Sequence, residues 1–123
     1  MSDSSVENKA LVRRIYEEMW NAHRPSAARG IFTHPEGVEH AVSEFLAAFP
    51  DLIHIVEEMI AEGDRVAVRF TARGTHTRQW KDFAPTGKAV TYTGVTLARL
   101  ADGLVLEHTT WWDRHGLVEQ LGR

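Results

Sequence analysis

Asp113 and His76 are the two side chains whose types and positions in the chain could carry out acid/base chemistry. Asp113 ends a predicted strand, residues 104–113, and follows Trp111 and Trp112 directly. A carboxylate beside aromatic surface is poorly solvated, which favours its protonated form and suits it to exchange a proton near neutral pH. That chemistry fits proton abstraction next to a carbonyl. The alternative is that Asp113 only caps the last turn, residues 114–120, through an exposed backbone amide.

His76 ends the most regular alternation in the chain, the predicted strand over residues 65–77. The same face of that strand carries Val66, Val68, Phe70, Ala72 and Gly74. A histidine that ends an apolar row could hydrogen-bond a substrate carbonyl or stabilise a developing enolate. It could equally be a satisfied residue at the rim of a core.

Strand parity divides the segment LVLEHTTWWD into two faces. One face carries Glu107, Thr109, Trp111 and Asp113, and the other carries His108, Thr110 and Trp112. If Asp113 faces a pocket, Thr109 and Trp111 line that pocket with it. His108 then lies on the surface or in a dimer face, unless a bulge changes the register.

Patterns of other chemistries are missing from the sequence. The seven histidines include no pair at the spacing of three or four that puts two metal ligands on one helical face, so no metal site is expected. There is also no G-x-S-x-G, P-loop or G-x-G-x-x-G motif. The sequence therefore predicts an enzyme or binding protein without a metal or nucleotide cofactor.

Two helices and four strands account for most of the chain. Ser4 and Glu7 have the spacing of a capping box, and an apolar stripe follows to about Asn21. Helical spacing resumes at Glu36 and stops at Pro50. Alternation with a period of two then predicts strands joined by short turns, which form an antiparallel meander. Helices followed by strands indicate an α+β domain in which helices cover one face of a curved sheet.

Aromatic side chains on these elements could line an apolar cavity for a flat ring system. Those expected in its wall are Tyr16, Trp20, Phe45, Phe70 and Tyr92, with Trp80 at its mouth.

Length, composition and charge limit the number of domains and the kinds of molecule that the protein could bind. A chain of 123 residues with 43% apolar content makes one domain, residues 1–123. A net charge of −3 with both signs interspersed indicates neither a nucleic-acid surface nor a membrane-binding arm. The start MSDSSVENKA lacks the pattern of a secretory signal, so we expect a cytoplasmic protein.

The motifs FPDLIHIVEEMIAEGDRVAVRFTARGTHT, APTGK and the ending D-x-x-x-L-x-x-Q-L-G, in this order and spacing, resemble the SnoaL-like polyketide cyclases. The resemblance implies the cone-shaped fold of the nuclear transport factor 2-like superfamily, with an apolar pocket. It implies an intramolecular aldol condensation of a polyketide ester without metal or cofactor. It also implies that Asp113 is the general acid/base of that reaction, and we expect His76 to assist.

Two features depart from the family pattern. Only residues 22–34 lie where relatives usually carry another helix and a short strand, so one pocket wall is expected to be missing or supplied by a partner chain. Thr109 stands where relatives commonly have a tryptophan. Both favour an alternative, a non-catalytic small-molecule-binding or dimerisation domain. An isomerase or an epoxide hydrolase on the same scaffold is a further alternative.

The outer face of the predicted sheet suggests a homodimer. The residues expected on this uncovered face are Arg69, Thr71 and Arg73 on one strand and Thr91, Thr93 and Val95 on the next.

Overall fold

In a computed structural model that describes residues 3–122, four helical segments precede one sheet and a fifth follows it. Helix α1 (Asp3–Arg14) continues into a π-helical segment, η1 (Ile15–Asn21). A short 3-10 helix, η2 (Pro25–Gly30), and helix α2 (Glu36–Ala48) follow. The expected long helices are confirmed. The first differs from expectation at both ends: it includes Asp3, so Ser4 lies inside the helix and does not cap it, and its last part is π-helical. No helix within residues 3–122 is long and apolar enough to cross a membrane.

Four strands form an antiparallel sheet in the order β1-β2-β3-β4. Their bounds are β1 (Ile53–Glu62), β2 (Arg65–Thr75), β3 (Ala89–Ala101) and β4 (Leu104–Trp112). Positive φ angles at Gly63 and Gly103 allow the tight turns that join neighbouring strands. Helix α3 (Arg114–Leu121) closes the chain. The α+β meander predicted from the alternation is thus confirmed.

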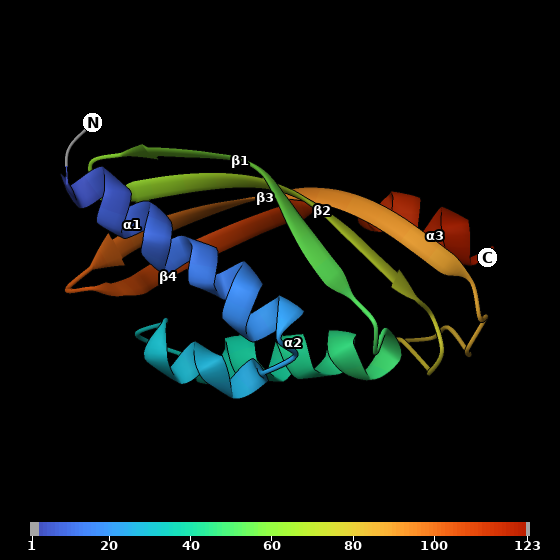
Figure 1. Cartoon of the computed structure of the whole chain (residues 1–123). Helices are drawn as coiled ribbons and strands as arrows, with labels where there is room; N and C mark the ends of the chain where they lie inside the picture. Colours follow the sequence, from blue (N-terminus) through green and yellow to red (C-terminus); the bar gives the residue numbers. More distant parts are fainter. Residues whose placement is uncertain (1–2, 123) are drawn as a thin grey trace.

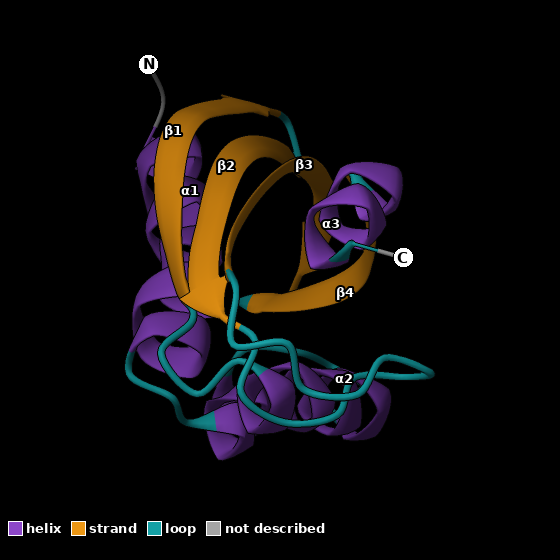
Figure 2. Ribbon diagram, turned by 90° about the vertical axis from the view of Figure 1, so that its right-hand side faces the viewer, coloured by secondary structure: helices purple, strands orange, loops and turns teal. Residues whose placement is uncertain are grey.

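The sheet is strongly curved, and α1 and α2 lie on its concave side (Figures 1 and 2). The even-numbered residues of β3, from Val90 to Leu100, point into this side and are buried. The concave cone predicted from the family resemblance therefore encloses the core.

The two edge strands, β1 and β4, each contain a bulge, and beyond each bulge the side chains switch to the opposite face of the sheet. In β4, Leu100 pairs with Val105 but Arg99 pairs with Glu107, so Leu106 is an extra residue. In β1, a second register shift leaves Glu57 as the extra residue. A bulge bends a strand and moves every later side chain to the opposite face.

The segment that follows η2 forms the wall that the short connector was expected to lack. Val105 donates its backbone N–H to Ile31 (2.8 Å), and Thr33 donates to the Val105 carbonyl (2.9 Å). Phe32 is buried between them. The expected gap is therefore wrong, because residues 31–33 pair with the edge of β4.

Helix α3 is fixed to β3 by the glutamine of the Q-L-G motif. The Gln120 side-chain amide accepts a hydrogen bond from the Thr91 N–H (2.8 Å) and donates one to the Thr91 carbonyl (2.7 Å). Leu117 and Leu121 are buried beneath the helix. Gly122 ends it in the left-handed conformation that glycine adopts without strain.

Candidate functional site

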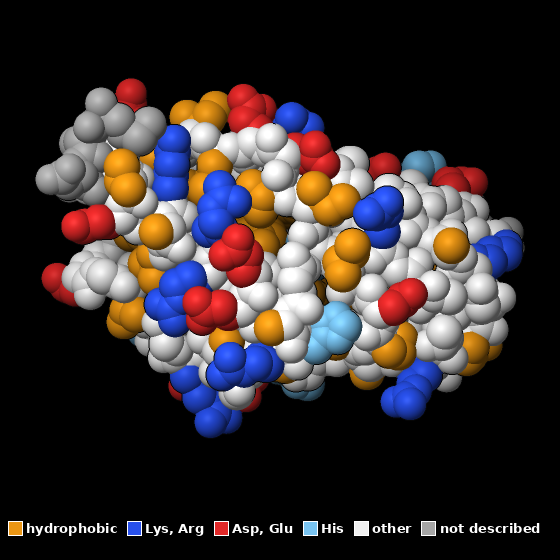
Figure 3. All heavy atoms as spheres, in the orientation of Figure 1, with side chains coloured by type: hydrophobic (Ala, Val, Ile, Leu, Met, Phe, Trp, Pro, Cys, Tyr) orange, Lys and Arg blue, Asp and Glu red, His pale blue; other side chains and the backbone are white. Residues whose placement is uncertain are grey.

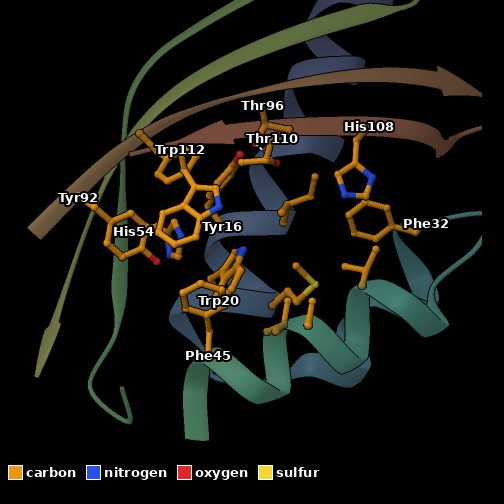
Figure 4. Close-up of a pocket in the computed structure, with 16 residues that line it drawn as sticks. Tyr16, Trp20, Phe32, Phe45, His54, Tyr92, Thr96, His108, Thr110 and Trp112 are labelled. Atoms are coloured by element: carbon orange, nitrogen blue, oxygen red, sulfur yellow. Dashed lines mark hydrogen bonds between the residues drawn. The ribbon is translucent and has the colours of Figure 1, made fainter. Parts of the chain in front are cut away.

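An aromatic cavity of about 240 Å³ lies between the helices and the concave face of the sheet (Figure 4). Its apolar wall comes mostly from the helices, and its few polar groups come mostly from the strands. The lining residues are Ile15, Tyr16, Met19, Trp20, Phe32, Val38, Ala41, Val42, Phe45, His54, Phe70, Tyr92, Thr96, His108, Thr110 and Trp112. Five of the six aromatic residues expected in the wall or mouth are among them: Tyr16, Trp20, Phe45, Phe70 and Tyr92.

The π-helical segment η1 supplies four of these side chains, Ile15, Tyr16, Met19 and Trp20. Its end is held to β1 by Asn21, which donates to the His54 carbonyl (2.8 Å) and accepts from the His54 N–H (2.7 Å). π-Helical turns are rare and often lie at functional sites. No local signal in the sequence distinguished this turn from ordinary α-helix.

Three hydroxyl groups form a chain along the sheet side of the cavity. Tyr16 hydrogen-bonds Thr96, and Thr96 Oγ1 lies 2.8 Å from Thr110 Oγ1. Burial raises the pKa of Tyr16 to about 12, so its hydroxyl keeps its proton at neutral pH. Burial also raises the pKa of Tyr92. These groups can therefore donate hydrogen bonds inside an otherwise apolar space.

His54 lies deep in the cavity, in a cage of aromatic rings. Its ring centre is 4.4 Å from that of Trp20 and 5.0 Å from that of Phe70, and its Nδ1 is buried without a hydrogen-bond partner. Desolvation lowers its pKa to about 3, so the ring is neutral at physiological pH. No pattern in the sequence singles out His54, because it lies in a strand of weak alternation.

His108, Thr110 and Trp112 face the cavity, and the opposite face of β4 points away from it. Counting from buried Val105 by simple alternation would point Glu107, Thr109 and Trp111 inward; the extra residue Leu106 reverses this. The expected inward direction of Thr109 and Trp111 is therefore wrong. His108 lines the cavity, as the alternative with a bulge allowed, and its side chain is exposed. Trp111 is 58% exposed on the outer side.

Asp113 lies outside the cavity lining. Its carboxylate accepts a hydrogen bond from the Gly116 N–H (2.8 Å) and caps α3. It borders a shallow groove on the outer face of the sheet, together with Arg69 and Trp111. Its geometry is that of the helix cap considered as the alternative, while its predicted acid/base role stays a prediction.

His76 and Trp80 lie behind the cavity rather than in its wall. His76 is fully buried, its ring centre 5.2 Å from that of Phe49, and its Nδ1 accepts from the Thr86 N–H (3.3 Å). Trp80 is 3% exposed and packs against Phe45 and under the Arg114 guanidinium. The structure therefore does not bring His76 and Asp113 together at the cavity, and it places Trp80 in the core instead of at a mouth.

Within residues 3–122, no three His, Asp or Glu side chains cluster as metal ligands would. The face shown in Figure 3 carries interspersed positive and negative side chains, without the continuous basic surface that nucleic acid requires. The cavity is thus the feature of the described chain that is best suited to bind a ligand.

Comparisons with known proteins agree with this architecture. Residues 10–121 match the family of SnoaL-like polyketide cyclases. Nogalonic acid methyl ester cyclase of Streptomyces nogalater is 30% identical over 94 residues, which cover 76% of this chain and 70% of that protein.

Solved structures show the same fold. AclR of Streptomyces galilaeus, a candidate hydroxylase, superposes with a TM-score of 0.88 at 29% identity, over 96% of this chain and 97% of its own. A candidate SnoaL-like polyketide cyclase from Jannaschia sp. CCS1 gives a TM-score of 0.91 at 25% identity, over 98% and 95%. The chain therefore belongs to the SnoaL-like polyketide cyclase family.

Proposed function

We propose that this protein binds a small hydrophobic carbonyl compound in the cavity and moves protons on it without a cofactor. The most concrete version is ring closure of a polyketide ester by intramolecular aldol condensation. The observation that carries the proposal is the composition of the cavity wall, in which aromatic rings surround a short chain of hydroxyl groups. Such a wall binds a flat ring system and orients it by its oxygen atoms.

The size of the cavity supports a compact ligand. A cavity of about 150 Å³ suffices for benzene, whereas drug-sized ligands occupy about 300 Å³ or more. The present 240 Å³ lies between these values. We therefore expect a compound with one or two fused rings to fit the cavity without rearrangement of its wall.

The acid/base role predicted for Asp113 can be tested apart from its role as a cap. Asparagine caps helices about as well as aspartate, so Asp113→Asn removes the carboxylate but keeps the cap. If Asp113 transfers the proton, the variant loses turnover at unchanged melting temperature. If turnover persists, the carboxylate only caps α3. His76 would then have no acid/base group to assist, and its predicted role would fail too.

The first experiment is to add 2-indanone to the protein in D₂O and follow both binding and exchange of the ketone CH₂ protons by NMR. Saturable binding with exchange faster than in buffer supports proton transfer at a carbonyl. No binding of 2-indanone or of larger aromatic ketones would contradict the proposal.

A non-catalytic ligand-binding domain is the second candidate function. The observation that favours it is that the cavity lining contains no carboxylate within the described residues. This function predicts that 2-indanone binds but exchanges its protons no faster than in buffer.

We also propose that the protein is a homodimer that pairs through the outer face of the sheet. Trp111, Val95 and Ile55 are exposed there, and Glu58 and Arg69 form an ion pair beside them (3.3 Å). A face that carries apolar side chains and both charges can complement its own copy across a twofold axis. Light scattering should give twice the monomer mass for the wild type and the monomer mass for Trp111→Lys; a monomeric wild type at tens of micromolar would refute the dimer.

A further inference from the structure

His108 and Thr110 form a neighbouring polar pair on the inner face of β4. Two residues apart on one strand, they leave the same face about 6.6 Å from each other along the strand. Figure 4 shows His108 beside Phe32 at one end of the cavity, with Thr110 and Thr96 between it and the opposite end, where Tyr92 and His54 lie. A ligand held under the sheet therefore meets both side chains.

Thr110 can present a free hydroxyl proton to a ligand. Either hydroxyl can donate in the hydrogen bond between Thr96 and Thr110; when Thr96 donates, the proton of Thr110 has no acceptor within the chain of hydroxyl groups. Successive hydrogen bonds polarise one another in the same direction. In the arrangement in which Thr96 donates, Thr110 is a strengthened donor, suited to a carbonyl oxygen that gains negative charge.

His108 differs from the other cavity histidine in its access to solvent. His54 is 5% exposed and too weak a base to accept a proton at neutral pH, whereas the His108 side chain is exposed and its ring lies 4.9 Å from that of Phe32. Partial desolvation lowers the pKa of His108, which leaves a free nitrogen lone pair at neutral pH.

The charged groups nearest to His108 along β4 are directed to the other face. Glu107 pairs with Arg99 there (2.7 Å). The other titratable groups of the cavity, Tyr16, His54 and Tyr92, carry no charge at neutral pH. No described carboxylate in the cavity thus competes with His108 for the proton.

We propose that His108 is the proton acceptor of the cavity and that Thr110 hydrogen-bonds the carbonyl oxygen of the ligand. The inference rests on the proposed function and names the groups that would carry it out. An imidazole nitrogen takes a proton from the carbon next to the carbonyl, and the C–H electron pair forms the enolate whose oxygen Thr110 stabilises. In ring closure, the enolate carbon then bonds to a second carbonyl carbon of the same molecule. The oxygen of that carbonyl receives the proton back from the imidazolium.

The test compares His108→Gln with the wild type, using 2-indanone in D₂O. We expect exchange catalysed by the protein to fall at least about 100-fold, the usual scale of general-base catalysis, while the Kd changes less than about threefold. His115→Gln is the matched control, because His115 is an exposed histidine on α3 that lies outside the cavity. It should leave exchange unchanged.

Two further variants separate a chemical role from a structural one. Added imidazole should restore exchange to His108→Ala, which it would not do if the side chain only supported the fold. Thr110→Val should weaken binding of 2-indanone about fivefold, the value of one hydrogen bond, but leave binding of indane unchanged because indane has no oxygen.

Failure of the inference differs from failure of the proposed function. Wild-type exchange that survives in His108→Gln overturns the role of His108 but keeps the enzyme. Loss of exchange in Asp113→Asn, with His108→Gln unaffected, would return the role to Asp113. If the wild type binds 2-indanone but does not accelerate exchange, both the proposed enzymatic function and the role of His108 as the base are refuted.

Discussion

The two faces of β4 carry similar side chains in very different surroundings. Trp112, Thr110 and His108 face the cavity, while Trp111 and Thr109 alternate with them and face outward. Residue type alone cannot tell these faces apart, because each has a tryptophan and a threonine. The difference arises at Leu106, the extra residue, and it shows that one backbone irregularity can decide which residues form a site.

Deletion of Leu106 tests this comparison most severely. Without the extra residue, regular alternation from Val105 would turn Glu107 and Trp111 inward and Trp112 outward. We expect a loss of more than about 4 kcal/mol in the free energy of unfolding, measured by urea denaturation, because charge enters the core. Leu106→Ala keeps the register and should cost about 1 kcal/mol; equal effects of the two changes would contradict the role of the bulge.

The two tryptophans offer a matched pair of substitutions. Trp112 packs against Tyr92 with ring centres 5.0 Å apart, whereas Trp111 is 58% exposed. Trp112→Ala should lower the free energy of unfolding by about 3 kcal/mol, and Trp111→Ala by less than about 1 kcal/mol in the monomer. A larger loss for Trp111→Ala at low protein concentration would invert the assignment of the faces.

The buried His54 should make stability depend on pH in a way that an exposed histidine does not. Its pKa is about 3 when folded and 6.5 when unfolded, so between these values the unfolded chain binds more protons. The contribution of His54 to the free energy of unfolding is therefore fully present above about pH 6.5. As the pH drops below that value, the contribution falls by up to about 1.4 kcal/mol per pH unit.

Urea denaturation at pH 7 and pH 5 measures this slope. His54→Leu should reduce the slope, and His115→Gln, which changes an exposed residue, should not. The remaining slope in His54→Leu comes from His76 and His108, whose pKa values burial also lowers. An unchanged slope in His54→Leu would contradict the neutral, buried state of His54.

Gly94, which is buried on the concave side of β3, has no room for a side chain. A Cβ atom at Gly94 would lie 2.6 Å from Phe70 Cζ and 2.9 Å from the Trp111 carbonyl oxygen. Gly94→Ala should therefore cost about 1–3 kcal/mol of unfolding free energy. Gly37→Ala, in α2 with open space around it, should instead stabilise by up to about 1 kcal/mol. The opposite pattern in thermal denaturation would argue against this packing of β3.

The smallest effect is expected from threonines on opposite sides of the sheet. Thr96→Val breaks the contacts to Tyr16 and Thr110 and should cost about 1 kcal/mol, because a buried hydroxyl loses its partner. Thr109→Val, on the outer face, should change the free energy of unfolding by less than about 0.5 kcal/mol. Similar effects of the two would show that the hydroxyl chain adds nothing to the fold.

Most of the fold followed from the sequence because its long helices and its central strands have strong local signals. The spacing of Leu11, Ile15 and Met19 predicts the first helix, and the alternation in residues 65–75 predicts the central strand. The aromatic wall was predicted for the same reason: large apolar residues on these elements must face the concave side.

The polar part of the site could not be predicted in this way. A bulge depends on pairing between strands, which the sequence of one strand does not reveal. The residues around Leu106 are equally compatible with a regular strand that has no bulge. The aromatic surroundings of His54 are made by Trp20, Phe70 and Tyr92. These contacts join segments that are far apart in the sequence, so no local pattern reveals them. Parity counted without the bulge also directed attention to Asp113 rather than to His108.

The π-helical segment η1 has a consequence for how such a binding site could change over generations. A π-turn corresponds to one residue inserted into an α-helix. Loss of a single codon within Ile15–Asn21 would restore α-helical geometry and rotate the residues that precede it relative to Asn21, which is anchored to β1. The cavity wall would then be rearranged in one mutational step, so relatives with new ligand preferences can arise through one-codon deletions as well as through substitutions.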